Sequence, residues 1–211
     1  MKIANYYAGV GGNSLHWHDD EVTSIEYTEA ICDINRVNHP NHQVLCCDAG
    51  EHLLAHYTEY DLIWASPPCQ GNSRMIRSGK NRKPRFPDLT LYEWVLFLQH
   101  NYKGLWVVEN VVPYYEPVIA PSHKIGRHLF WSNFDLAGVA EVKQPDNFIN
   151  LGTLDGMRKI QDWLGVSYHK SVYYEGNHDP AQIYRNAVHP DVGLAIRNKA
   201  KITFDNANWQ G

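Results

Sequence analysis

The sequence predicts an α/β fold, with a mostly parallel sheet that carries helices on both faces. Three observations support this prediction. Short apolar runs recur along the 211-residue chain. Segments with helical spacing or helical length separate several of these runs. The runs end in a glycine turn, an acidic residue or prolines. Because strands that are joined through helices form right-handed βαβ units, we expect them to share one sheet.

Six apolar runs are expected to form the strands. In chain order they are KIANYYA, VTSIEY, HQVLCCD, YDLIWAS, GLWVVENV and HLFWSNFDL. A helix is expected to begin at NSLHWHD, behind the glycine-rich turn that ends the first run. A second helix, of roughly ten residues, follows the second run and is closed by His39 and Pro40. A third is expected at LTLYEWVLFLQHNY, where Leu91, Val95 and Leu98 form an apolar stripe.

Charge and composition exclude some classes of protein. The net charge is −4 and the pI about 6.3, so the whole chain is not a cationic nucleic-acid-binding protein, and any such site must be a local patch. Four cysteines without a C-x-x-C pair favour reduced thiols over a disulfide framework. The sequence shows neither a signal-peptide pattern nor an apolar run long enough for a membrane helix. We therefore expect an intracellular protein, cytoplasmic or nucleoid-associated, without a membrane partner.

The carboxyl ends of the predicted strands gather the residues that carry chemistry. In parallel sheets, ligands bind at these ends. The ends hold a glycine turn, two acids, a thiol and a further carboxylate, at Gly9, Gly11, Glu26, Asp48, Cys69 and Glu109. This convergence predicts one binding site at one edge of the sheet.

The glycine turn and the acids that follow it favour a nucleoside cofactor. Gly9, Gly11 and Gly12 let the backbone approach a ligand closely. Glu26 stands at the end of the second strand, where an acid commonly binds a ribose diol. The turn carries no basic residue and no phosphate-binding lysine, which favours a nucleoside without pyrophosphate. S-adenosylmethionine is the candidate, and Asp48 is expected to accept a hydrogen bond from its adenine amino group.

Cys69 occupies a stiff position between a strand and a loop. Pro67 and Pro68 precede it and hold the chain extended, and Gly71 and Asn72 follow as turn formers. A thiol held in this way suits a nucleophile. A small apolar side chain at the end of a strand is the other interpretation, and these residues alone leave both open.

The order of several motifs resembles the DNA (cytosine-5) methyltransferase family. The motifs are YYAGVGG, IEY, CCDAGE, SPPCQGNS, VVENV, GRHLFWSNF and IYRNAVHPDV, which span nearly the whole chain. The resemblance implies a Rossmann-like, S-adenosylmethionine-dependent methyltransferase fold, with residues 1–211 as a single catalytic domain. It also implies methylation of C5 of cytosine in DNA, through a covalent Cys69–C6 adduct, on a base that is flipped out of the duplex.

The resemblance assigns roles to single residues. Cys69 matches the nucleophile, Glu109 matches the carboxyl group that hydrogen-bonds N3 of the ring, and Arg127 matches the arginine beside O2. Besides the three glycines, Glu26 and Asp48, the implied cofactor contacts are Tyr7, Pro68, Asn186 and Ala187, with core packing as a further role for the tyrosine. The implied nucleic-acid contacts follow the nucleophile, at Gln70, Ser73, Arg74, Arg77, Lys80, Arg82, Lys83 and Arg85.

Two departures from the family pattern concern specificity. The target-recognition region is reduced to a vestigial segment at about 132–182. Between the motifs that contain Arg127 and Arg158 it has only about 20 residues, SNFDLAGVAEVKQPDNFINLG, which is too short for an independent domain. We therefore expect low selectivity, readout by the basic segment after Cys69 and the few residues near 168–182, or a protein partner that supplies specificity. In the second departure, His123 and Ile125 replace two residues of the family's Q-x-R-x-R pattern.

Other functions stay open on the sequence alone. One is a shortened, non-catalytic relative that binds nucleic acid or regulates a larger partner. Another is the same chemistry on RNA, single strands or free cytosine nucleotides, which would explain the reduced recognition segment.

Several conspicuous residues are given no functional role. His16, His18, Asp19 and Asp20 lie close together but lack the spacing of a zinc site, so no metal is expected. The residues expected to pack in the core are Trp64, Trp106, Trp131, Cys46 and Cys47.

Overall fold

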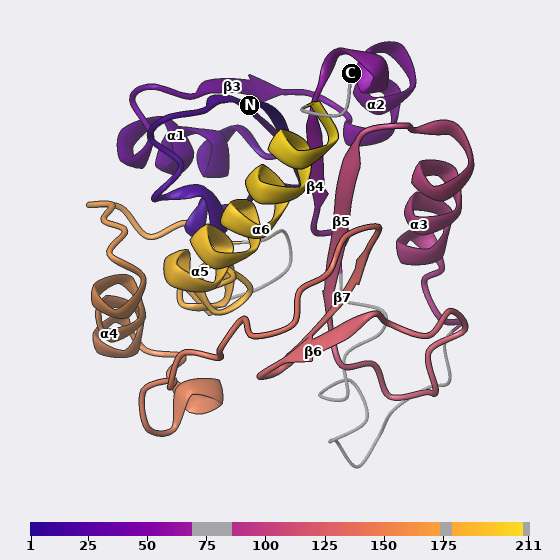
Figure 1. The fold of residues 1–211 in the computed structure, drawn as a ribbon. Coiled ribbons are helices and arrows are strands. Elements are labelled where there is room, and N and C mark those ends of the chain that lie inside the picture. The colour runs from indigo at the N-terminus through magenta and orange to yellow at the C-terminus, as the bar shows by residue number, and fades with distance from the viewer. Residues whose placement is uncertain (69–85, 174–178, 209–211) are drawn as a thin grey trace.

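The computed structural model describes residues 1–68, 86–173 and 179–208 (Figure 1). One seven-stranded sheet forms its centre, in the order β3-β2-β1-β4-β5-β7-β6. Strands β1 to β5 are parallel, β7 is antiparallel to β5, and β6 is antiparallel to β7. The strands are β1 Lys2–Tyr6, β2 Glu21–Glu26, β3 Gln43–Cys46, β4 Leu62–Ala65, β5 Leu105–Val111, β6 His123–Ile125 and β7 His128–Ser132. This arrangement confirms the Rossmann-like α/β fold class.

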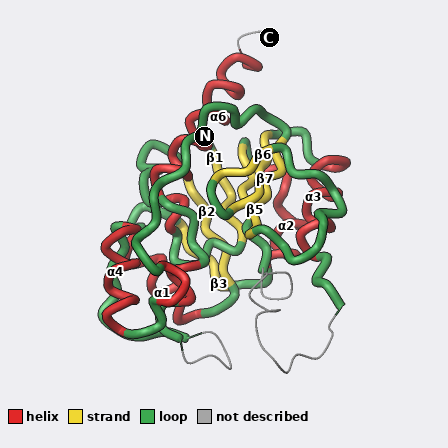
Figure 2. Tube along the Cα trace, turned by 90° about the horizontal axis from the view of Figure 1, so that it is seen from below, coloured by secondary structure: helices red, strands yellow, loops and turns green. Residues whose placement is uncertain are grey.

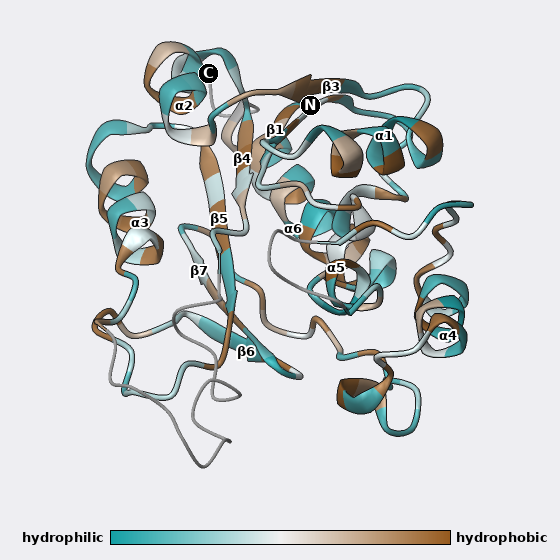
Figure 3. Ribbon diagram, turned by 180° about the vertical axis from the view of Figure 1, so that it is seen from behind, coloured by the Kyte–Doolittle hydropathy of each residue, from teal (hydrophilic) through white to brown (hydrophobic). Residues whose placement is uncertain are grey.

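Helices cover both faces of the sheet, as expected. Figure 2 shows α2 and α3 on one side and α1, α4 and α6 on the other. The helices are α1 Glu29–Asn38, α2 Ala49–His56, α3 Thr90–Asn101, α4 Leu154–Leu164, α5 Gln182–Arg185 and α6 Pro190–Asn208. The predicted second and third helices are confirmed as α1 and α3, and the apolar stripe of α3 is buried against the sheet. Both helices contain hydrophobic (brown) and hydrophilic (teal) residues in Figure 3, as amphipathic helices do.

The strands are apolar because both of their faces are buried. In β4, Leu62 and Trp64 pack with the core on one face, whereas Ile63 and Ala65 pack with the core on the other. This alternation follows from the two-residue period of a strand, and a strand that is covered on both sides reads as a continuous apolar run.

The predicted helix at residues 13–19 is wrong. Only a short 3₁₀ turn forms there, η1 Gly12–Ser14, and the C-terminal helix α6 packs against it. Gly193 of α6 makes this close approach possible, because a Cβ at that position would lie 1.9 Å from the carbonyl oxygen of Asn13. Trp17 is buried against Trp64, with ring centres 5.7 Å apart, so the chain after the turn fills the core instead of continuing as a helix.

Most of the other packing predictions are confirmed, and one is wrong. Trp64, Trp106 and Trp131 are buried in the core, which confirms them. Cys47 packs against the core on the α3 side, but Cys46 is exposed at the end of β3, so that prediction is wrong. In the described part of the chain, none of the helices combines the length and apolarity needed to cross a membrane.

Candidate functional site

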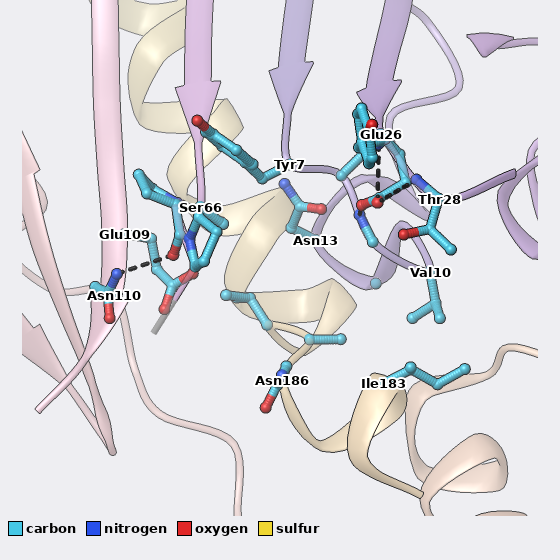
Figure 4. Close-up of a pocket in the computed structure, with 18 of the residues that line it drawn as sticks. Tyr7, Val10, Asn13, Glu26, Thr28, Ser66, Glu109, Asn110, Ile183 and Asn186 are labelled. Atoms are coloured by element: carbon cyan, nitrogen blue, oxygen red, sulfur yellow. Dashed lines mark hydrogen bonds between the residues drawn. The ribbon is translucent and has the colours of Figure 1, made fainter. Parts of the chain in front are cut away.

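A cavity of about 450 Å³ opens at the carboxyl ends of the parallel strands (Figure 4). The residues that line it come from the ends of β1, β2, β4 and β5, the start of α2, helix α5 and the segment that joins α5 to α6. They are Tyr7, Ala8, Gly9, Val10, Gly12, Asn13, Glu26, Tyr27, Thr28, Asp48, Ser66, Pro67, Pro68, Glu109, Asn110, Val111, Ile183, Asn186, Ala187 and Val188. The cavity thus brings together Glu109 and each predicted cofactor contact except Gly11.

Glu26 joins the glycine turn to the rim of the cavity. Its Oε2 accepts a hydrogen bond from the backbone N–H of Gly9 at 3.1 Å. Its Oε1 accepts from the N–H groups of Tyr27 and Thr28 at 2.9 and 3.0 Å. Each carboxylate oxygen has two acceptor sites, so Oε2 keeps one for a ligand. Glu26 therefore shapes the site as well as facing it.

Gly11 does not line the cavity, but it helps to fix the conformation of the glycine turn. Its φ of 78° lies in the left-handed region. A Cβ there would lie 2.2 Å from Cε1 of His39, whose Nε2 is 2.9 Å from the carbonyl oxygen of Gly11. Asn35 donates to the carbonyl oxygen of Gly9 at 3.1 Å. Buried side chains at α1 and its C-terminal end thus fix the turn, and burial lowers the pKa of the histidine.

Tyr7 and Asp48 each have a structural contact as well as a place in the lining. Tyr7 has a φ of 55°, a conformation that non-glycine residues rarely adopt, and its ring packs edge-on against Trp94 at 5.2 Å. Burial raises the pKa of its hydroxyl to about 12, so the group stays neutral at neutral pH. Asp48 caps α2, where its Oδ1 accepts from the N–H of Glu51 at 2.8 Å.

Glu109 marks the other end of the cavity. Figure 4 shows it across the cavity from Glu26, with Tyr7 and Asn13 between them. The side chain of Glu109 is buried, and its Oε1 contacts Nδ1 of His128 on the neighbouring strand β7. The strand register explains this contact: His128 lies opposite Val111 on β5, which makes it the diagonal neighbour of Glu109.

Arg127 fixes the tautomer of that histidine. Its Nε donates to Nε2 of His128 at 3.2 Å, so the ring proton lies on Nδ1 and is donated to Glu109. The guanidinium of Arg127 itself lies 5.1 Å from the ring centre of Phe148 and lines a neighbouring cavity of about 600 Å³. In this structure Arg127 reaches Glu109 through His128, and Trp163 and His189 share the second cavity with it.

Asn110 holds the segment that leads to the predicted nucleophile. Its Nδ2 donates to the carbonyl oxygen of Pro67 at 3.0 Å, and its Oδ1 accepts from the N–H of Val111 at 2.9 Å. Pro67 and Pro68 line the cavity. The remaining predicted residues lie outside the described residues, namely Cys69, Gln70, Ser73, Arg74, Arg77, Lys80, Arg82, Lys83 and Arg85.

The structure adds residues that sequence reasoning missed. Tyr27 and Thr28 continue the chain from Glu26 along the rim, and their position directly after a predicted strand end was a usable signal. Ser66 could have been found in the same way, one residue beyond β4. His128 had no such signal, because its contact with Glu109 depends on the register of two antiparallel strands.

The chain resembles methyltransferases over part of its length. No protein-family model matches the sequence. It is 30% identical over 120 residues to the "Type II methyltransferase M1.HphI" of Haemophilus parahaemolyticus. This match covers 53% of this chain and 32% of that protein. The chain therefore spans about a third of the length of the curated relative it matches.

Solved structures of methyltransferases are similar to about half of the chain. A DNMT2 mutant from Spodoptera frugiperda is 22% identical, with a TM-score of 0.37, over 53% of this chain and 35% of that one. A putative DNA modification methyltransferase encoded within an Escherichia coli prophage is 19% identical, with a TM-score of 0.38, over 55% of this chain and 33% of that one.

Proposed function

We propose that this protein is an S-adenosylmethionine-dependent methyltransferase that modifies C5 of cytosine in DNA, with Cys69 as the nucleophile and residues 1–211 as one catalytic domain. The observation that carries the proposal is a shared cavity. Glu26 and Asp48 line it at one end, and Glu109 lines it together with Pro67 and Pro68, the two residues that lead directly to Cys69.

The lining fits a sulfonium nucleoside better than a nucleotide. Among the described residues that line the cavity there are three carboxylates and no lysine, arginine or histidine. A pyrophosphate would meet negative charge there, whereas the positive sulfonium of S-adenosylmethionine would be attracted. The free acceptor site of Glu26 suits a ribose hydroxyl, and Asp48 suits the adenine amino group. When bound, the cofactor supplies an electrophilic methyl group.

Cys69 and Glu109 supply the activation of the base. The Cys69 thiolate adds to C6 of cytosine, and the electron pair of the C5–C6 double bond becomes available at C5. Glu109 supports the addition when its carboxyl group carries a proton, because that group then donates a hydrogen bond to N3 and draws electron density out of the ring. After C5 has been methylated, a water molecule or a nearby base removes the C5 proton, and the thiolate leaves from C6. His128 orients the Glu109 carboxyl group for this role, because its Nδ1 proton is donated to Oε1.

DNA is the proposed substrate because of two observations. The curated relative is described as a type II methyltransferase, and the segment from Arg74 to Arg85 carries six basic residues and no acid. Basic residues bind phosphates without reading sequence, so they supply affinity. Specificity would then come from residues around 132–182 or from a protein partner.

Methyl transfer from labelled S-adenosylmethionine tests the proposal. The purified chain should label duplex DNA, with single-stranded DNA, transfer RNA and dCMP as parallel substrates. Labelling should disappear in Cys69→Ser and persist in Cys47→Ser, the matched thiol control. Labelling of RNA or dCMP alone would overturn the DNA assignment. Nucleic-acid binding without labelling of any substrate would favour a non-catalytic relative.

A further inference from the structure

Three metal-ligating side chains converge outside the cavity. Glu29 and Cys32 lie on the first turn of α1, and Cys46 lies at the end of β3. One carboxylate oxygen and the two Sγ atoms all lie within 4.8 Å of one another. The cluster is distinct from His16 and His18, which are more conspicuous in the sequence. Its two cysteines are 14 residues apart along the chain, and the β2–α1–β3 crossover brings them together.

The geometry of the cluster suits a cation with tetrahedral coordination. Zinc binds thiolates at about 2.3 Å, which places two sulfur ligands about 3.8 Å apart in a tetrahedral site. The 4.8 Å limit on the cluster leaves only small side-chain movements to reach that separation. Cys46 is exposed and Cys32 is buried beneath it, so an ion can enter from solvent and be partly enclosed. Three protein ligands leave the fourth position for water.

A cationic side chain lies beside the cluster. Two thiolates and a carboxylate around a divalent ion carry a net charge of −1. Nη1 of Arg36 lies 2.6 Å from Oε1 of Glu29 and 2.9 Å from Oδ1 of Asp33, so it offsets part of that negative charge. Because cysteine binds a metal ion as the thiolate, a cation that binds here displaces the protons of both thiols.

We propose that Glu29, Cys32 and Cys46 form a binding site for a thiophilic divalent cation of the zinc class, and that its occupancy is coupled to the cofactor cavity. The coupling runs through two backbone carbonyl groups. Sγ of Cys32 donates to the carbonyl oxygen of Glu26 at 3.5 Å, and Sγ of Cys46 donates to that of Tyr27 at 3.2 Å. Glu26 and Tyr27 line the cavity. A cation bound to both sulfur atoms replaces their protons, so these two hydrogen bonds are lost and the rim is released.

Cadmium titration tests the site directly. Cd²⁺ is the probe because thiolate-to-cadmium charge transfer absorbs in the ultraviolet and its intensity reports the number of thiolates bound. The background is Cys69→Ser, which removes a competing thiol. We expect one Cd²⁺ per chain with the absorbance of two thiolates and the release of two protons. Cys32→Ser and Cys46→Ser should each lower the affinity at least tenfold, whereas Cys47→Ser should not.

The coupling has its own readout. Binding of S-adenosylhomocysteine, measured by calorimetry in the same background, should weaken by about fivefold or more with saturating Cd²⁺, the lower range of typical allosteric couplings. Cys46→Ser should abolish this difference. Equal Cd²⁺ absorbance in Cys46→Ser and in its parent would overturn the site. Unchanged affinity with Cd²⁺ bound would overturn the coupling. Neither result depends on methyl transfer, so the proposed function is tested separately.

Discussion

Replacing His128 tests how the buried carboxylate of Glu109 is held. Glu109 is only 3% exposed, and His128 donates to its Oε1. His128→Ala removes that donor and leaves a buried carboxylate oxygen without it. A hydrogen bond to a charged group contributes about 1.5–3 kcal/mol, so the two side chains should be coupled by that amount in the free energy of unfolding.

A double-mutant cycle measures this coupling. Urea denaturation of the parent, His128→Ala, Glu109→Gln and the double variant gives the interaction free energy. His123 and Asp135 provide a matched control, because they are 3.3 Å apart but the aspartate side chain is 72% exposed. That pair should be coupled by less than about 1 kcal/mol. A coupling below about 0.5 kcal/mol between His128 and Glu109 would refute the claim that this hydrogen bond holds the Glu109 side chain.

Three further predictions concern the packing of α6, the titration of His42 and the rim of the cavity. Gly193→Ala should destabilise the fold by at least about 2 kcal/mol in urea denaturation, because its Cβ would meet the carbonyl group of Asn13, and a neutral effect would contradict the close packing of α6. Burial lowers the pKa of His42 to about 4, below its unfolded value of about 6.5. Protonation therefore favours the unfolded state, so stability should be complete above pH 6.5 and fall as the pH decreases toward 4, and His42→Asn should reduce that fall. An acid sensitivity that is unchanged in this variant would assign the effect to other groups. Glu26→Gln should weaken S-adenosylhomocysteine binding by about tenfold in calorimetry, whereas Glu51→Gln on α2 should not, and equal effects would remove the specific role of Glu26.

The sheet was predictable because its signals are local. Each parallel strand is a short apolar run closed by a glycine, an acid or a proline, and these residues also mark the edge where ligands bind. The amino-acid pattern alone therefore places Glu26, Asp48 and Glu109 at one edge, and all three line the cavity. His39 and Pro40 likewise give the end of α1.

The parts that the sequence did not reveal depend on distant contacts. The expected helix after the glycine turn is absent because α6, from the other end of the chain, packs against that turn. The contact between His128 and Glu109 requires the antiparallel register of β5 and β7, which apolar patterning does not specify. The prediction that Cys46 packs in the core is wrong because its position at the end of β3 leaves it exposed.

Trapping with a DNA duplex that carries 5-fluorocytosine tests the central claim most directly. Fluorine at C5 cannot leave as the proton does, so the covalent bond between the enzyme and C6 should persist after methyl transfer. We expect a denaturation-resistant complex that requires S-adenosylmethionine, with the cross-linked peptide mapped to Cys69 by mass spectrometry. The complex should be absent in Cys69→Ser and present in Cys47→Ser. Labelled DNA without a trapped complex, or a complex mapped to another residue, would contradict Cys69 as the nucleophile.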